Sequence, residues 1–504
     1  MKKNISIATI YLFLFLSICS CAKLKETPYS FIPADQFYKT SDHAVAAING
    51  CYKAFIEMGE HGYAMDLLYM IEVPTEVVTN SRWDGDGGDW DYARWTNSKA
   101  ELVWVWRMFY TAINRCNAVL DKVPGIAMDS RLKNRILGEA RFLRAHSYFN
   151  IVRLWGDAPL YVHEVTGIEQ SREKRSPAQD IYQLIIEDLQ FAAANCYKKA
   201  AYTAPSDIMR VSSGAAKAML GKVYLTMSGH PLQDQSKLAL AKQVLKEVID
   251  EAEYSLCANY ADIFDVKKKN GPEHIYSITF GNSLGMGYGN TLGHFFAPYA
   301  YSNLTPVGAS WGEITMEPEF LNAFDLANDK RVAQAILLEY NDVWGGVNKY
   351  QEQYWMPYIR KYIDDASVTQ GWAGYQFDIP VLRYADVLLM YAEVINEMGS
   401  PDAEAYAAFN KVRQRAGIAD LDEGLSQQAF RDSMILERKR EFFAEFHGWF
   451  DYVRKGILVS QMTEVKNDWG VYPSYYKMEE FRTLMPIPAE EKMANPNLEQ
   501  NAGY

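Results

Sequence analysis

The chain has 504 residues, of which 49% are hydrophobic and 23% charged, a balance typical of globular proteins and not of disordered or polytopic membrane proteins. Acidic residues outnumber basic ones, 63 to 51, which gives a net charge of −12. This charge argues against nucleic acid as a partner, because contact with a phosphate backbone needs clustered Lys and Arg. Aromatic residues are abundant, with 12 Trp, 34 Tyr and 23 Phe.

The first 20 residues have the features of an export signal. Two lysines precede an apolar run at residues 5–18, which is shorter than the about 20 residues that a membrane-spanning helix needs. The small residue Ser20 directly precedes Cys21, as in a bacterial lipobox, so we predict that Cys21 is the acylated first residue of the mature chain. The alternative is ordinary cleavage near the same point. Residues 21–504 keep 49 basic and 63 acidic residues, so acyl chains rather than charge would hold the protein to a membrane.

Helical periodicity dominates most of the remaining chain. In residues 99–123, for example, apolar side chains recur at intervals of three and four, and the pattern stops at Pro124 and Gly125. The same criteria predict helices at about 42–58, 99–123, 129–155, 177–196, 210–228, 236–253, 380–398, 402–416 and 426–455. Successive helix pairs of similar length indicate a solenoid-like stack, although no clean repeat of about 34 residues is present. The protein is therefore predicted to be mainly α-helical.

Residues 254–378 interrupt this helical pattern. Glycines mix there with aromatic residues and prolines, and only short strand-like runs such as His274–Phe280 occur. No Pro-rich linker or change of composition divides the chain, and a loop region this long is uncommon unless it is functional. We therefore predict one domain over residues 21–504, with helical parts at about 21–253 and 379–504. Residues 254–378 form a large irregular insert within it, called the insert below.

Two of the predicted helices carry complementary charges. The helix near residues 380–398 is apolar on nearly all sides but includes Arg383, Asp386 and Glu393, and charges in such a setting need partners. The helix at 426–455 contains the run Glu-Arg-Lys-Arg-Glu. We predict that these helices pack together with ion pairs at their interface, rather than forming a catalytic acid–base set.

The sequence offers no clear catalytic or metal-binding motif. The four cysteines beyond the signal region lie far apart, without a CxxC spacing or a nearby pair of histidines, so we predict buried free thiols and no zinc site; the alternative is oxidation after export. They are Cys51, Cys116, Cys196 and Cys257. No HExxH or GxSxG motif is present, and we interpret the histidines as structural. These histidines are His146, His163 and His447.

Aromatic residues in loops are the candidate ligand-binding groups. Sugars present apolar CH faces and polar hydroxyl edges, so a site for them needs exposed rings beside amides, carboxylates or Arg. The Gly-rich segment 80–95 offers indoles as stacking surfaces, at Trp83, Trp90 and Trp95. It also offers hydrogen-bonding groups, at Asn80, Arg82 and Asp84. The insert adds rings at Tyr288, His294, Phe295, Phe296, Tyr299, Tyr301 and Trp311, of which Tyr288 and Trp311 are the favoured candidates. The alternative is that such rings fold back and cover the underside of their own loop.

The same segment invites comparison with a calcium loop. Asp84, Asp86, Asp89 and Asp91 could present oxygen ligands around a Gly-rich turn. The EF-hand pattern fails, however, because its sixth position is Asp89 rather than Gly and its twelfth is Trp95 rather than Glu. We therefore favour a solvated acidic loop and predict neither a bound metal nor a cofactor.

Several sequence blocks, in fixed order and spacing, carry a resemblance to one protein family. They lie at residues 138–149, 154–160, 379–393, 412–417, 437–442, 449–454, 485–488, 495–498 and 501–504, and they include Leu-Trp-Gly-Asp-Ala-Pro-Leu and Val-Leu-Arg-Tyr-Ala-Asp-Val-Leu-Leu-Met-Tyr-Ala-Glu. Together with the lipobox, these blocks resemble the SusD/RagB lipoproteins from the N-terminus to the last residue. They mark the fold and do not identify a ligand.

This resemblance implies a nutrient-binding lipoprotein of the outer membrane, lipid-anchored and displayed at the cell surface. It implies a superhelix of tetratricopeptide-like helix pairs, a ligand site formed by loops and the insert, and a SusC-like TonB-dependent β-barrel transporter as partner. We therefore predict a non-enzymatic protein that captures oligosaccharides and delivers them to that transporter. The alternatives are a helical-repeat scaffold that binds proteins and a secreted glycoside hydrolase.

Overall fold

The computed structural model describes residues 36–57, 61–80, 85–204, 207, 209–281, 289–299, 301, 310–352, 356–363, 375–465 and 478–504. The predicted signal peptide and Cys21 lie outside these residues. Within them, no helix combines the length and the apolar character that crossing a membrane requires. Helices predominate and the strands are short, which confirms the predicted mainly α-helical fold.

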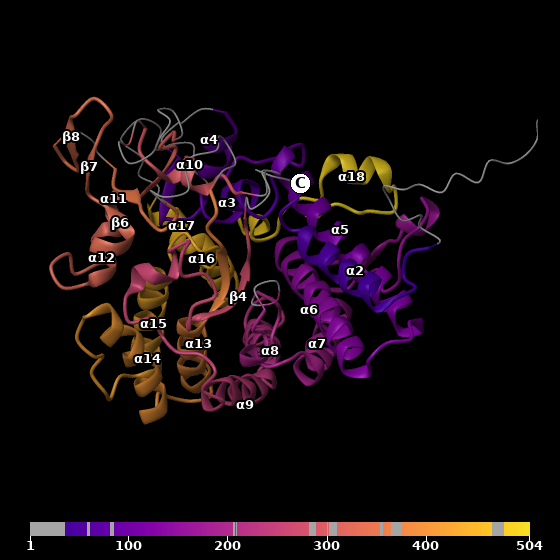
Figure 1. The fold of residues 1–504 in the computed structure, drawn as a ribbon. Helices are drawn as coiled ribbons and strands as arrows, with labels where there is room; N and C mark the ends of the chain where they lie inside the picture. The colour runs from indigo at the N-terminus through magenta and orange to yellow at the C-terminus, as the bar shows by residue number, and fades with distance from the viewer. Residues whose placement is uncertain are drawn as a thin grey trace, which may run out of the picture.

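The helices of the N-terminal half form a packed series (Figure 1). They are α2 (Ser41–Lys53), α3 (Met65–Ile71), α4 (Gly85–Asp91), α5 (Ala100–Lys122), α6 (Ser130–Trp155), α7 (Ala178–Asn195), α8 (Ser213–Ser228) and α9 (Lys237–Asp250). From α5 to α9, each helix packs against the next one in sequence. Local caps set several of these ends: the Asp129 carboxylate accepts a hydrogen bond from Leu132 N at the start of α6, and Ser212 caps α8 in the same way.

The C-terminal helices continue the series. They are α13 (Tyr384–Glu397), α14 (Ala403–Ala416), α15 (Gln427–Phe442), α16 (Gly448–Lys455), α17 (Leu458–Val465) and α18 (Ala489–Ala494). Helix α13 packs against α9, α14 and α15, so the C-terminal part joins the N-terminal part without a break in the stack. The pairs α6–α7, α8–α9 and α13–α14 form the predicted tetratricopeptide-like superhelix (Figure 1).

The prediction of one helix at 426–455 is wrong. Helix α15 ends at Phe442 and α16 begins at Gly448, and between them Ala444 and Phe446 adopt positive φ angles of 57° and 64°. A residue with a β-carbon adopts that conformation at a cost of about 1–2 kcal/mol. The break places Glu445 between two buried cations, Lys361 and Arg383, which compensates for the strained backbone.

Short antiparallel pairs of strands complete the fold. One pair lies between α6 and α7, and the others involve the insert or its borders. The pairs are β1 (Val78–Asn80) with β5 (Ile314–Met316), β2 (Ala158–Pro159) with β3 (Arg175–Ser176), β4 (His274–Ile278) with β10 (Ile379–Arg383), β6 (Ile336–Leu337) with β9 (Tyr358–Ile359), and β7 (Glu339–Asn341) with β8 (Val347–Lys349). Three short helices accompany them: α10 (Leu292–Phe296), α11 (Pro318–Leu321) and α12 (Lys330–Ala335). Strand β10 occupies the first residues of the helix predicted at 380–398, because it pairs with β4 at the opposite border of the insert.

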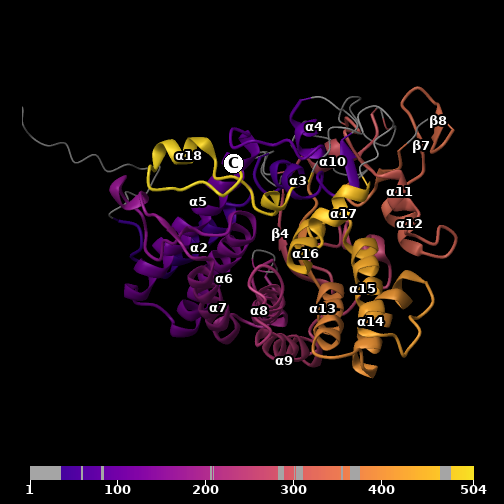
Figure 2. The same ribbon diagram turned by 180° about the vertical axis from the view of Figure 1, so that it is seen from behind.

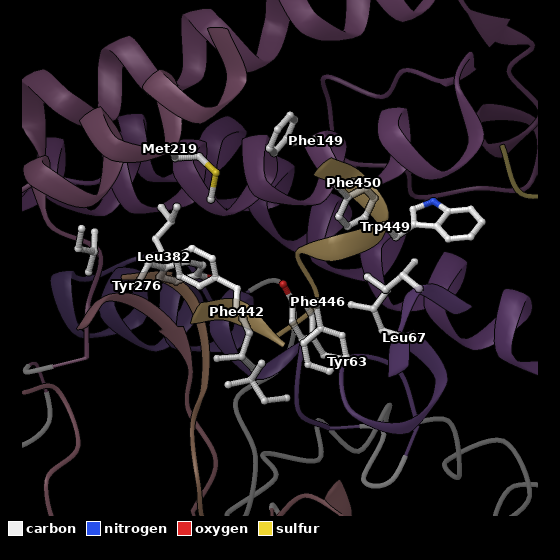
Figure 3. Packing of buried hydrophobic residues seen from close by; sticks show 14 of the residues in the cluster. Tyr63, Leu67, Phe149, Met219, Tyr276, Leu382, Phe442, Phe446, Trp449 and Phe450 are labelled. Carbon is white, nitrogen blue, oxygen red and sulfur yellow. The ribbon is translucent and has the colours of Figure 1, made fainter. Parts of the chain in front are cut away.

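One hydrophobic core connects the helical parts with the insert. Figure 3 shows Phe149 of α6 and Met219 of α8 facing Tyr276 of β4 and Leu382 of β10. The segment between α15 and α16 adds Phe446, whose ring packs edge-on against Tyr63. The four described cysteines are buried and unpaired by disulfides, which confirms the prediction made for them.

Buried ion pairs join α13 to α15 and α16, as predicted. Arg438 Nη1 of α15 lies 2.8 Å from Asp386 Oδ1 of α13. Arg383, which directly precedes α13, contacts Glu441 Oε1 at 2.9 Å, and it also contacts Glu273 and Glu445. Its guanidinium therefore connects α13, α15, the start of β4 and the break before α16.

We expect Arg383→Met to reduce the free energy of unfolding by about 3–5 kcal/mol, because it leaves buried carboxylates without one of their partners. Arg172→Met is the matched control, since Arg172 forms an exposed pair with Glu169 and its loss should cost less than about 1 kcal/mol. Urea unfolding of both variants measures the difference. Equal losses of unfolding free energy in the two variants would show that the Arg383 cluster stabilises the protein no more than an exposed ion pair does.

Glu393 should make stability depend on pH. Burial alone would raise the pKa of Glu393, but Arg454 and Lys455 lower this pKa from 4.5 to about 2. A carboxyl whose pKa is lowered by folding stabilises the protein above its unfolded pKa, and this contribution is lost as pH falls toward the folded pKa. The stability difference between the parent chain and Glu393→Gln should therefore shrink by roughly 2 kcal/mol between pH 5 and pH 3. A difference that stays constant in urea titrations over this range would contradict the assignment.

Candidate functional site

The two aromatic regions that the sequence singles out meet at one end of the molecule. Strand β1, which precedes the segment 81–95, pairs antiparallel with β5 of the insert, so that Asn80 lies opposite Ile314. Helix α4 contacts β1, and α10 contacts β5. The hairpin β7–β8 projects at the same end, at the edge of the molecule in both ribbon views (Figures 1 and 2).

The prediction that Trp90 and Trp95 present exposed rings is wrong. Both indoles are buried and stack on each other, with ring centroids 5.0 Å apart and planes inclined by 24°. Trp95 also packs against Trp449 of α16, and its Nε1 donates a hydrogen bond of 3.0 Å to the hydroxyl of Tyr504, the last residue of the chain. The physical reason is that residues 85–91, which include Trp90, form helix α4 instead of an open loop, and that Trp95 meets partners distant in sequence, Trp449 and Tyr504.

Asn80 is also buried, which contradicts its predicted role as an exposed hydrogen-bonding group. Its Nδ2 donates to Glu313 Oε1 at 3.2 Å, and the same oxygen accepts a hydrogen bond from the Tyr69 hydroxyl at 2.6 Å. Asn80 thus joins β1 to the insert from the inside. The sequence around Asn80 could not predict this, because the partner Glu313 precedes a strand that is more than 200 residues away.

Four predicted binding residues lie outside the described part of the chain. They are Arg82, Trp83, Asp84 and Tyr288. Of the acidic residues considered for calcium, Asp89 forms an ion pair of 2.7 Å with Lys99, and Asp91 accepts a hydrogen bond of 3.0 Å from Thr79. Among the described residues, no group of three or more His, Cys, Asp and Glu side chains could hold a metal ion.

Trp311 is the predicted residue that the structure leaves partly exposed. Its indole packs edge-on against His294 and Phe295 of α10, at centroid distances of 4.6 and 5.8 Å, and its backbone N donates to His294 O at 2.8 Å. The next residue, Gly312, has a φ of 61° and lies directly against Pro298 and Tyr299, where a β-carbon would be 3.2 Å from Tyr299 N. Trp311 and Tyr299 are therefore held on adjacent segments of the insert.

Two aromatic side chains on the insert stand in solvent. Tyr299 is 57% exposed and Trp344 is 72% exposed. Their ring centroids lie 6.4 Å apart with planes inclined by 40°. We define the aromatic surface as Tyr299, Trp311 and Trp344. Sequence reasoning named Tyr299 among the rings of the insert but missed Trp344, although its position in Asp-Val-Trp-Gly-Gly, a turn-forming sequence, was an available signal.

The turn that carries Trp344 is held by Asp342. One oxygen of this carboxylate, Oδ1, accepts hydrogen bonds from the backbone N of Trp344 at 2.9 Å and of Gly346 at 2.8 Å. The other, Oδ2, accepts one from Asn348 Nδ2 at 3.0 Å. The hydrogen bond from Asn348, followed by those from the backbone, lowers the pKa of Asp342, so the turn is stable while the carboxylate is charged. Gly345 has a φ of 86°, which favours glycine at this position.

A series of tyrosines supports this turn from below. Tyr340 of β7 packs edge-on against Tyr301 at 6.0 Å and against Tyr358 of β9 at 5.9 Å. The Tyr358 ring in turn lies 3.0 Å from the position that a β-carbon of Gly312 would occupy. The exposed rings therefore rest on packed side chains, and their positions are set before a ligand arrives.

This surface offers binding chemistry. Two tilted rings can stack on the CH face of a sugar, and the polar turn next to them can satisfy its hydroxyl groups. Glycoside hydrolysis would need a carboxyl of raised pKa at the bond to be cleaved. Within the described residues, burial raises the pKa of Glu72 to about 8 and also raises the pKa values of Glu139, Asp188 and Asp378. All four side chains are buried in the interior, where they bond to Phe446 N, Arg210, Arg144 and Lys269, respectively.

Two family models match the chain. Residues 338–504 match a model described as the SusD family, and residues 51–225 match one described as starch-binding associating with outer membrane. The chain is 26% identical to SusD-like protein P25 of Formosa agariphila, over 98% of each chain. It is 25% identical to the starch-binding protein SusD of Bacteroides thetaiotaomicron, over 88% of this chain and 86% of that protein.

The fold is also found in solved structures. A SusD superfamily protein from Parabacteroides distasonis matches with a TM-score of 0.77 and 27% sequence identity, and the match covers 92% of this chain and 99% of that one. A SusD homologue from Bacteroides thetaiotaomicron matches with a TM-score of 0.80 at 23% identity, covering 93% and 98% of the two chains. The helical superhelix and its insert are thus a shared architecture.

The contrast between buried and exposed indoles can be measured. We expect Trp90→Ala to reduce the free energy of unfolding by about 3–5 kcal/mol, because it empties a volume in the core. Trp344→Ala should change it by less than about 0.5 kcal/mol, because most of this side chain is in water. Urea unfolding of the two variants checks both values, and a large loss for Trp344→Ala would mean that this ring is structural.

Proposed function

We propose that the chain is a glycan-binding protein of the SusD family that associates with the outer membrane, and that it captures oligosaccharides on its aromatic surface without cleaving them. We further propose that it is anchored through acylated Cys21, displayed at the cell surface, and delivers its ligand to a SusC-like TonB-dependent transporter. The starch-binding name of one relative supports a glycan as the ligand class.

The exposed pair Tyr299 and Trp344 is the observation that carries this proposal. Large aromatic side chains at these exposures leave apolar area in water, which is unfavourable unless a ligand covers it. Their separation of 6.4 Å allows neighbouring sugar units, or two faces of one unit, to contact both rings. The hydrogen-bonded turn at Asp342 keeps Trp344 in place, so little ordering entropy is lost on binding.

The position of helix α2 supports the proposed lipid anchor. Helix α2, next to the first described residues, lies on the side of the molecule opposite the β7–β8 hairpin in both ribbon views (Figures 1 and 2). Fourteen residues lie between Cys21 and Gln36, so the two can be at most about 50 Å apart. Such a tether would leave the aromatic surface free to face away from the membrane.

Native electrophoresis through gels that contain different polysaccharides tests the proposed function. We expect the mature chain to be retarded in at least one gel relative to a gel without polysaccharide, with no release of reducing sugar. Trp344→Ala and Tyr299→Ala should each lower the affinity for the polysaccharide up to about tenfold and so weaken the retardation, because stacking on one ring contributes about 0.5–1.5 kcal/mol beyond the area that it buries.

Ile168→Ala is the matched control, since Ile168 is 70% exposed but lies outside the insert. This variant should migrate like the parent chain in every gel. Retardation that survives the loss of both Tyr299 and Trp344 would contradict the proposed site, and release of sugar by the parent chain would contradict the proposal that binding is non-catalytic.

A further inference from the structure

A cavity lies in the helical part of the molecule, away from the insert. Its volume is about 930 Å³, and it lies between α6, α7, α16, α17 and the C-terminal segment. Its wall includes apolar side chains, among them Tyr182, Leu232, Phe450, Val453, Leu458 and Leu484. His230 and Asp157 on its rim are exposed, so the cavity is open to solvent.

Arg153 of α6 is the charged side chain that distinguishes this cavity. Its guanidinium stacks on the rings of Phe149 of α6 and Phe450 of α16, at 3.9 and 3.6 Å from their centroids. Figure 3 labels these two phenylalanine rings. Its Nε donates to Phe149 O at 3.0 Å, and its Nη2 donates to Asn150 Oδ1 at 2.7 Å. Nη1 has no hydrogen-bond partner among the described residues.

Arg153 also has no carboxylate within 4.0 Å in the described part of the chain. The acidic groups that act on it from farther away, Asp451 and Asp386, already form ion pairs with Arg438. Arg454, on the wall of the same cavity, shows the usual arrangement, because Glu393 holds it at 2.6 Å. Partial burial lowers the pKa of Arg153 to about 10, so the side chain remains a cation at neutral pH, and it meets the cavity without an ion-pair partner.

The other charged groups on the cavity wall do not neutralise the positive charge of Arg153. Arg175 bonds to the carbonyl oxygens of Trp155, Asp157 and Glu499 and to Asn501 Oδ1, and it has no carboxylate within 4.0 Å among the residues described. The acidic side chains that line the cavity are Asp157 and Glu480, both exposed at its rim. The interior therefore carries positive charge, and the negative charge lies toward solvent.

We propose that this cavity is a second binding site, specific for a small ligand that carries a carboxylate on an apolar or sugar body. The carboxylate would accept hydrogen bonds from Arg153 Nη1 and provide its missing counter-charge. The body of the ligand would lie against Tyr182, Leu232 and Phe450. This site is independent of the aromatic surface on the insert.

Calorimetric titration of the mature chain with matched probes tests this site. One pair is benzoate and benzyl alcohol, and the other is D-glucuronate and D-glucose, so that the two arms distinguish an apolar carboxylate from a sugar carboxylate. We expect at least one carboxylate to bind about tenfold or more tightly than its neutral partner. Arg153→Met should remove this preference, while Arg131→Met, at an exposed position on the same helix, should retain it.

Two variants provide a second readout. Urea unfolding of Arg153→Met should show a folded chain, so that its binding can be compared with that of the parent. Leu232→Trp, which fills the cavity from its rim and leaves Arg153 in place, should abolish binding without changing the charge. Absence of carboxylate preference in the parent chain, or its survival in Arg153→Met or Leu232→Trp, would each overturn the proposal. Retardation in polysaccharide gels should be unchanged in these variants, so the two sites can fail separately.

Discussion

The architecture depends on the need of buried charges for partners, and the cluster around Arg383 is the clearest case. One guanidinium contacts Glu273 at the start of β4, Glu441 at the end of α15 and Glu445 in the break before α16. Lys361, from the insert, lies in the same cluster and donates to Glu445 at 2.7 Å. These groups are costly to bury singly, so the segments that carry them must come together. The cluster thereby attaches the insert to the helical stack.

This attachment explains how an irregular segment can present a fixed binding surface. Strand pairs β4–β10 and β1–β5 hold the borders of the insert against the helices, and packed tyrosines hold its interior. Solvent-exposed rings are useful for recognition only when their positions are set in advance, because a mobile ring loses entropy when it binds. Tyr299 and Trp344 combine exposure with such support. The helical stack therefore provides stability, and the insert provides the proposed ligand-binding surface.

The sequence predicted the helices well because their apolar spacing and caps are local signals. It also predicted ion pairs between α13 and α15, since charges on an apolar helix require partners. It failed at 443–447, where positive φ angles are imposed by Lys361 and Arg383, residues distant in sequence. It failed for Trp95 for a similar reason, because its partners Trp449 and Tyr504 lie more than 350 residues away, and Trp90 in turn stacks on the ring of Trp95. Long-range contacts decide which rings are exposed, and periodicity carries no information about them.

The most direct test of the proposed glycan site is a crystal structure of the chain with an oligosaccharide from the polysaccharide that retards it. We predict a sugar ring stacked on Trp344 or Tyr299, with its hydroxyl groups bonded to the turn that Asp342 organises. A well-ordered sugar bound elsewhere, with both of these rings still in water, would contradict it.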